Sequence, residues 1–264
     1  MGDENRKRTH NYWNNKVKQN SVEPGASGLF FTCEGREKQA VYEAYSIIDE
    51  FLDDYSNGIS TSNPNIVNED DSQNSDEDIA DALKKACNNE RKSKLKHEKR
   101  RRCIQRPTGI KNCIFISVKD ANINLLAEKM VDLAQKSPRC RCLHRVLPVE
   151  YTAQVDINKL NEIIMKIVSE NLKPRENGTL PTYSVEFKTR NNDRIDKSTI
   201  LGMVNDAVSA FAPNAKVNLN HADITFYIQL CRKTIMAGIC RSFYDRKKYS
   251  MRPTKNIGDA PDTS

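Results

Sequence analysis

The chain has 264 residues and a formal net charge of +7, a length that suits one large domain or two small ones. Hydrophobic residues make up 38% of it and gather in periodic stretches that can form a core, but the longest apolar runs are far too short to cross a bilayer. The basic balance makes a polyanion a candidate partner. Because the first residues are polar, we expect no secretion signal, and a reducing compartment in which the eight cysteines are free thiols.

The first part of the chain is polar and basic and has no periodicity, so we expect residues 1–27 to be a disordered basic tail. A short apolar run over residues 29–33, bounded by glycines, predicts a buried strand. Apolar residues then recur at helical spacing from Arg36 to about Tyr55, which predicts an amphipathic helix.

A charged insertion interrupts this pattern. Residues 56–78 are rich in asparagine, serine and carboxylates and predict a disordered acidic insertion. Residues 79–102 carry many lysines and arginines and predict a basic helix. Such a helix is typical of a solvated face or a nuclear localisation signal, and it could equally be a ridge that contacts phosphates.

Regular elements return after the insertion. Residues 113–118 predict a second buried strand, residues 122–135 a helix, and residues 142–154 an extended stretch interrupted by Pro148. Strands and helices in this alternation are typical of a ferredoxin-like α/β sandwich. We therefore predict a ferredoxin-like domain over residues 28–144.

The last hundred residues again alternate between strand and helix patterns and predict a second α/β unit over residues 145–249. Asp156 caps one predicted helix, and a second helix spans residues 198–211. Beyond these residues the pattern is lost, so we expect residues 250–264 to be a disordered tail. The expected strands share apolar runs or alternation and lie at residues 183–188, 216–219, 224–230 and 235–239.

The motifs of common enzyme classes are missing from the sequence. There is no phosphate-binding glycine loop and no GxSxG nucleophile motif. Cys140, Cys142 and His144 form a possible metal cluster, but their spacing differs from that of zinc knuckles and is typical of strand residues. We therefore expect a protein that is not an enzyme and needs no cofactor or metal.

Five segments stand out along the chain, at residues 30–40, 145–149, 187–192, 216–220 and 246–250. In this order and spacing they resemble the eukaryotic THUMP-domain adaptor family of tRNA N4-acetylcytidine formation. The sequence departs from the family pattern at Asn218, where an aspartate is common, and near His221, where a proline is common.

The resemblance implies a ferredoxin-like domain followed by a THUMP domain. It implies binding of the tRNA acceptor stem and its single-stranded 3′ end. It also implies an adaptor role, in which serine and leucine tRNAs are presented to an RNA cytidine acetyltransferase that modifies a D-arm cytidine. The expected location is the nucleus and nucleolus, with the cytoplasm as a further site. No membrane and no small-molecule substrate are expected.

The residues expected to contact RNA are cationic and amide side chains that the strands of the second unit could bring to one face. Arg36 and Lys38 are added because they lie in the first turn of a helix, where backbone amides favour anions. The other expected contacts are Lys188, Arg190, Asn191, Asn192, Arg194, Arg232, Lys233, Arg241, Arg246, Lys247 and Lys248.

Three alternatives remain open from the residues alone. The first is a general RNA-binding or ribosome-assembly factor with no role in acetylation. The second is a tRNA-modifying enzyme with an unfamiliar catalytic site. The third is an interaction module that docks through the acidic insertion and has no affinity for RNA.

Overall fold

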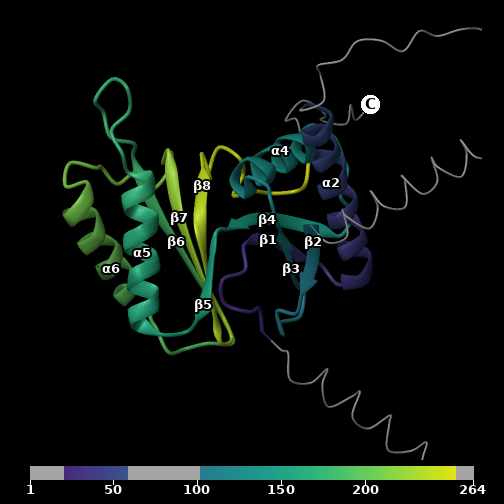
Figure 1. The fold of residues 1–264 in the computed structure, drawn as a ribbon, viewed down its shortest axis with the longest axis horizontal. Coiled ribbons are helices and arrows are strands. Elements are labelled where there is room, and N and C mark those ends of the chain that lie inside the picture. The colour runs from purple at the N-terminus through teal and green to yellow at the C-terminus, as the bar shows by residue number, and fades with distance from the viewer. Residues whose placement is uncertain (1–20, 59–101, 254–264) are drawn as a thin grey trace, which may run out of the picture.

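The computed structural model describes residues 21–58 and 102–253, which form two α/β domains side by side (Figure 1). Within these residues, each domain has a four-stranded sheet and two helices. The mixed α/β class predicted from the sequence is therefore confirmed. Within the described ranges, none of the helices combines the length and the apolar composition needed to cross a membrane.

The first domain runs strand, helix, strand, strand, helix, strand. Its sheet is antiparallel throughout, with the strands in the order β2-β3-β1-β4. This order is that of a ferredoxin-like fold, which confirms the predicted fold of this domain. Its elements are β1 (Gly28–Cys33), α2 (Glu37–Gly58), β2 (Cys103–Arg106), β3 (Cys113–Val118), α4 (Ile123–Lys136) and β4 (Leu143–Val149).

The second domain has its strands in the order β5-β8-β7-β6, with β6 parallel to β7 and the other pairs antiparallel. Its helices begin at aspartate caps. The predicted cap Asp156 accepts backbone hydrogen bonds at the start of α5, and Asp196 does the same for α6. The elements are β5 (Tyr151–Gln154), α5 (Ile157–Asn171), β6 (Tyr183–Arg190), α6 (Lys197–Phe211), β7 (Ile224–Cys231) and β8 (Thr234–Arg241).

The second sheet is buried on both faces. Side chains alternate along β7, so Phe226, Ile228 and Leu230 join the core beneath α5 and α6. Tyr227 and Cys231 point the other way and join the core of the first domain. In Figure 1, α5 and α6 accordingly cover the side of the sheet that faces away from the first domain. The two domains therefore share one packed interface.

A close backbone approach between β8 and β4 fixes this interface. Gly238 lies against β4 so closely that a Cβ atom there would come 2.5 Å from the Pro148 carbonyl oxygen. The N–H of Glu150 donates a hydrogen bond of 2.9 Å to the Ala237 carbonyl. Only glycine permits such an approach, because any larger side chain would push the strands apart.

The domain boundary lies later than the sequence indicated. Residues 143–149 pair with β1 in the first sheet, so the division falls at Glu150 rather than after His144. Pro148, which was expected to interrupt the extended stretch, lies inside β4. It is tolerated because β4 is an edge strand of its sheet, where the missing N–H removes no ladder bond.

Parts of both expected disordered tails are ordered against the domains. Val22 is 2% exposed, and the Thr234 hydroxyl donates to its carbonyl at 3.1 Å. At the other end, Met251 is buried and its N–H donates to the His144 carbonyl at 2.8 Å. The expected tails at 1–27 and 250–264 must therefore be shortened by at least residues 21–27 and 250–253.

Two further differences concern strands. Residues 103–106 form β2, which the sequence pattern did not indicate. The expected strand at 216–219 is reduced to a single bridge between Val217 and Tyr183. The expected acidic insertion and basic helix lie outside the described residues, apart from the end of α2 and Arg102.

Candidate nucleic-acid interface

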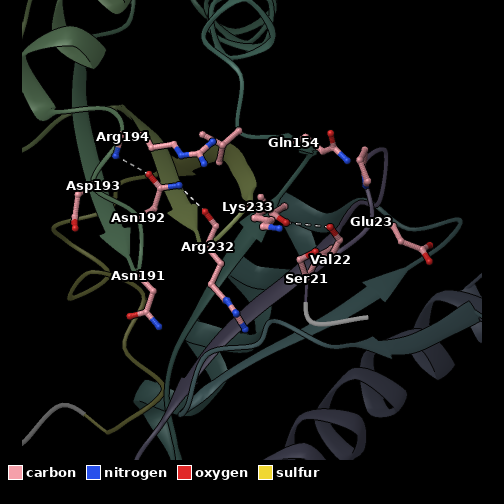
Figure 2. A pocket seen from close by; sticks show the side chains of 13 residues that line it. Ser21, Val22, Glu23, Gln154, Asn191, Asn192, Asp193, Arg194, Arg232 and Lys233 are labelled. Carbon is pink, nitrogen blue, oxygen red and sulfur yellow. Dashed lines mark hydrogen bonds between the residues drawn. The ribbon is translucent and has the colours of Figure 1, made fainter. Parts of the chain in front are cut away.

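A cleft of about 840 Å³ opens where the end of β6 and the β7–β8 turn meet the ordered N-terminal residues (Figure 2). We call it the outer cleft. The cations of Arg194, Arg232 and Lys233 outnumber the carboxylates of Glu23 and Asp193 along its walls. The cleft therefore favours an anionic ligand. Its walls are formed by residues 21–24, 154–155, 191–194 and 232–234.

The buried side chain of Asn192 holds the outer cleft together. Its Nδ2 donates to the main-chain carbonyl of Arg232, and its Oδ1 accepts from the Arg194 N–H at 2.9 Å. Both halves of the amide are thus bonded within the protein, so Asn192 has a positioning role instead of the expected contact with RNA. The neighbouring Asn191 is exposed and remains a candidate contact.

The β7–β8 turn consists of Arg232 and Lys233. Arg232 has a left-handed φ of 53°, and its N–H donates to the Arg190 carbonyl at 2.9 Å, which ties the turn to the end of β6. Its guanidinium donates to the Gly109 carbonyl of the first domain at 3.3 Å. Lys233 is exposed beside it (Figure 2). The turn therefore presents two cations at the junction of the domains.

A smaller pocket of about 230 Å³ lies between the two sheets, and we call it the inner pocket. Lys188 and Arg190 reach it because they pair with Gln229 and Cys231 on β7 and so share the sheet face that meets the first domain. Its walls are formed by Thr32, His144, Arg145, Leu147, Lys188, Arg190, Tyr227 and Phe243.

Positive charge dominates the inner pocket. Burial lowers the pKa of the Lys188 amine, and the charges of Arg145, Arg190 and Lys248 lower it further. The Glu186 carboxylate opposes this at 4.0 Å from Lys188 Nζ. The lysine is therefore held among like charges, an arrangement that a bound anion would relieve.

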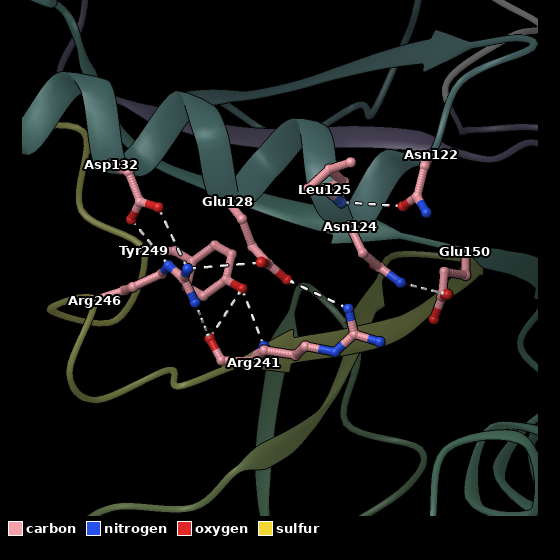
Figure 3. A network of polar contacts seen from close by, with 9 residues as sticks. All are labelled: Asn122, Asn124, Leu125, Glu128, Asp132, Glu150, Arg241, Arg246 and Tyr249. Carbon is pink, nitrogen blue, oxygen red and sulfur yellow. Dashed lines mark hydrogen bonds and ion pairs between the residues drawn. The ribbon is translucent and has the colours of Figure 1, made fainter.

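Arg241 and Arg246 lie in a different place and bind the two domains together (Figure 3). Arg246 donates to the carboxylate of Asp132 on α4 at 3.0 Å and lies 3.6 Å from Glu128. Arg241 lies 3.8 Å from the same Glu128 carboxylate. Both arginines thus pair with carboxylates of the first domain. The Arg246 side chain is largely enclosed by these pairs, whereas the Arg241 side chain remains 55% exposed.

The remaining expected contacts line neither the outer cleft nor the inner pocket. Lys247 and Lys248 are exposed in the turn after β8, where both have left-handed φ angles. The charge of Lys248 nevertheless reaches Lys188, as the lowered pKa of Lys188 indicates. Arg36 and Lys38 are exposed at the start of α2 in the first domain. The residues expected to form a single basic face thus lie in the outer cleft, in the inner pocket, after β8 and at the start of α2.

Sequence reasoning missed Arg145 as a site residue, although the residue stands in one of the segments that carried the family resemblance. The alternation of β4 could have revealed it, since Arg145 and Leu147 line the inner pocket from one strand.

The metal cluster is not seen: among the described residues, no group of three or more His, Cys, Asp or Glu could hold a metal ion. His144 instead contacts Glu34 at 3.0 Å and Arg252 at 2.7 Å.

Residues 154–239 match the sequence model of the THUMP domain. The chain is 22% identical over 241 residues to THUMP domain-containing protein 1 of Mus musculus, across 88% of this chain and 65% of the mouse protein. It is 23% identical over 242 residues to the Homo sapiens protein of the same name, across 88% and 64%. The match thus spans less than two thirds of the length of each of these relatives.

Solved structures give weaker likenesses. A crystal structure of PH1313 from Pyrococcus horikoshii Ot3 has a TM-score of 0.42 and 12% identity, and covers 82% of this chain and 56% of that one. A 4-thiouridine synthetase in complex with RNA and ATP has a TM-score of 0.36 and 11% identity. The match covers 50% of this chain and 31% of the synthetase chain. The matched residues 154–239 span β7 and most of the second sheet. The second domain of this chain is therefore a THUMP domain.

Proposed function

We propose that this chain binds RNA, and tRNA in particular, across the outer cleft and the inner pocket. THUMP domain proteins bind RNA and act in tRNA modification, and the matched residues supply the β7–β8 turn and the end of β6. The observation that carries the proposal is the convergence of cations from β6, from the loop after it and from the β7–β8 turn. The outer cleft gathers Arg194, Arg232 and Lys233, and the inner pocket gathers Lys188 and Arg190.

This arrangement suits a ligand with both a duplex and an unpaired end. Duplex RNA is recognised mainly by its shape and phosphates, for which clustered cations are suited. Unpaired nucleotides also expose base edges that form hydrogen bonds with amide groups. The exposed amides of Asn191 and Gln154 lie in the outer cleft beside its cations (Figure 2). We therefore propose the acceptor stem and the 3′ end of tRNA as the ligand.

A binding comparison tests this proposal. Fluorescence anisotropy would measure the affinity of the full chain for tRNA, for an acceptor-stem hairpin with its 3′ single strand, and for the same hairpin made blunt. We expect the first two to bind alike and the blunt hairpin to bind more weakly. Equal affinity for all three would remove the 3′ end from the proposal, and no binding at physiological salt would remove RNA altogether.

We further propose that the chain is an adaptor and not itself a catalyst. Among the described residues, neither cleft has a serine or cysteine together with a histidine in its walls. The resemblance to the acetylation adaptor family and the homology to THUMP domain-containing protein 1 support a partner RNA cytidine acetyltransferase. In this proposal the protein presents serine and leucine tRNAs to that enzyme in the nucleus or nucleolus.

Nucleoside analysis of RNA from cells that lack the protein tests the adaptor role. We expect N4-acetylcytidine to disappear from tRNA and to persist in ribosomal RNA, and the acetyltransferase to be recovered with the tagged protein. Unchanged N4-acetylcytidine in tRNA would favour a general RNA-binding factor instead. Modification of tRNA by the pure protein with acetyl-CoA or S-adenosylmethionine would show that it is an enzyme.

A further inference from the structure

The inner pocket holds more positive charge than its protein surroundings balance. Within the described part of the chain, no ion pair involves Arg145 or Arg190, and the Glu186 carboxylate lies 4.0 Å from Lys188 Nζ. His144 is already engaged by Glu34 at 3.0 Å. Charges in a half-buried site are costly unless they are paired, so this cluster is incomplete without an anion.

Arg190 provides an independent sign of a missing partner. Its guanidinium lies 5.9 Å from the centroid of the buried Phe30 ring, and its Nε is buried without a hydrogen-bond partner among the described residues. A buried N–H of a charged group that lacks an acceptor is rare in folded proteins and calls for an explanation. The pocket wall brings Arg190 together with Lys188 and Arg145, so an oxyanion there would lie among three cations.

The size of the pocket limits what this anion can be. About 230 Å³ is below the range of pockets that hold cofactors or drug-sized ligands, but it admits a small group together with some water. A phosphate group presents several oxygens, which matches cations that approach from two different sheets. Arg190 of the pocket directly precedes Asn191 of the outer cleft in the chain.

We propose that the inner pocket is a phosphate site, in which Arg145 of the first domain and Lys188 and Arg190 of the THUMP domain hold one phosphate group of the bound RNA. The inference rests on the proposed RNA binding. It adds that RNA contacts both domains at once and that the domain interface itself builds the site. The phosphate is either a terminal 5′-monoester or an internal diester, which share this chemistry.

The variants Arg145→Gln and Lys188→Gln of the full chain test the site, because they remove charge and keep most of the side chain. Lys159→Gln is the matched control, since Lys159 is exposed on α5 and lines neither cleft. Thermal unfolding would verify that each variant is folded. We expect each pocket variant to lower the affinity for RNA by about tenfold, as the loss of one charge-assisted hydrogen bond does, and the control by less than twofold.

Calorimetric titration with inorganic phosphate gives a measurement that needs no RNA. We expect the unmodified chain to bind phosphate, and both pocket variants to lose this binding while the control keeps it. Binding of phosphate without binding of RNA would leave the pocket intact and refute the proposed function. Phosphate and RNA affinities equal to those of the control in folded pocket variants would refute the pocket.

Oligonucleotides with a 5′-phosphate or a 5′-hydroxyl separate the two sources. A preference for the 5′-phosphate that disappears in Lys188→Gln would identify the terminal monoester. Equal affinity for both ends, with the same loss in the variant, would identify an internal diester.

Discussion

The side-chain amide of Asn192 donates to the main-chain carbonyl of Arg232, which joins the loop after β6 to the β7–β8 turn. The same side chain accepts from the Arg194 N–H at 2.9 Å. Two cations of the outer cleft are thus positioned by one buried asparagine. Their placement depends on this hydrogen-bonded contact as well as on the strands themselves.

Replacing Asn192 by alanine is expected to lower the free energy of unfolding by about 0.5–1.5 kcal/mol for each of its two hydrogen bonds. The groups that lose their partner, the Arg232 carbonyl and the Arg194 N–H, are partly buried. The variant should also bind RNA more weakly, since Arg232 and Arg194 lose their common support. Urea denaturation and anisotropy would measure the two effects. Asn161→Ala is the control, because Asn161 is exposed on α5 and lines neither the outer cleft nor the inner pocket. Equal results for both variants would show that the amide of Asn192 positions nothing.

Replacing Gly238 by alanine is expected to destabilise the chain by about 1–3 kcal/mol through overpacking. The added Cβ would come 2.5 Å from the Pro148 carbonyl oxygen and 3.3 Å from the Glu150 nitrogen. Gly202→Ala is the control, because a Cβ at this exposed position of α6 meets nothing within 4 Å. We expect that variant to gain up to about 1 kcal/mol, since alanine favours helix over glycine. Equal urea midpoints for the two would contradict the close approach of β8 to β4.

Replacing Asp223 by asparagine is expected to weaken the start of β7 in a pH-dependent manner. Burial raises the pKa of Asp223, but Arg175 at 2.7 Å and hydrogen bonds from Thr182 outweigh it and hold the pKa below its usual value. A lowered folded-state pKa stabilises the protein above the unfolded pKa of about 4, and that stability is lost as the pH falls through the folded pKa.

We therefore expect Asp223→Asn to cost less than about 1 kcal/mol at pH 7, because the pair is partly exposed and screened. The difference from the unmodified chain should shrink between pH 4 and lower values. Urea denaturation across this pH range would measure it, with Asp206→Asn on α6 as the control. A difference that stays constant down to acid pH would show that the ion pair with Arg175 contributes nothing.

Much of the fold could be predicted because its main elements have strong local patterns. The continuous apolar run of β3 and the aspartate cap of α5 are both visible in the sequence. β2 was missed because it has four residues and follows directly after a basic run. The expected strand at 216–219 failed because Val217 and Leu219 are 58% and 66% exposed, so no core fixes it in a sheet.

The candidate site was harder to predict because its geometry depends on contacts between distant residues. Nothing local shows that Asp132 and Glu128 on α4 neutralise Arg246, whose sequence position is more than a hundred residues later. Nothing local shows that the first domain contributes Arg145 to a pocket with Lys188. The residue types were therefore predictable, whereas their division between a binding surface and a domain interface required the packing of the two sheets.

The salt dependence of tRNA binding tests the central claim most directly. The variant Arg194→Gln, Arg232→Gln, Lys233→Gln removes three cations of the outer cleft. A control with Lys159, Lys173 and Lys216 changed to glutamine removes the same charge from exposed sites outside both clefts. We expect the slope of log affinity against log salt to fall by about 2–3 in the first variant, at 0.7–0.9 for each phosphate contact, and to change little in the control. Equal slopes in both variants would contradict RNA binding in the outer cleft.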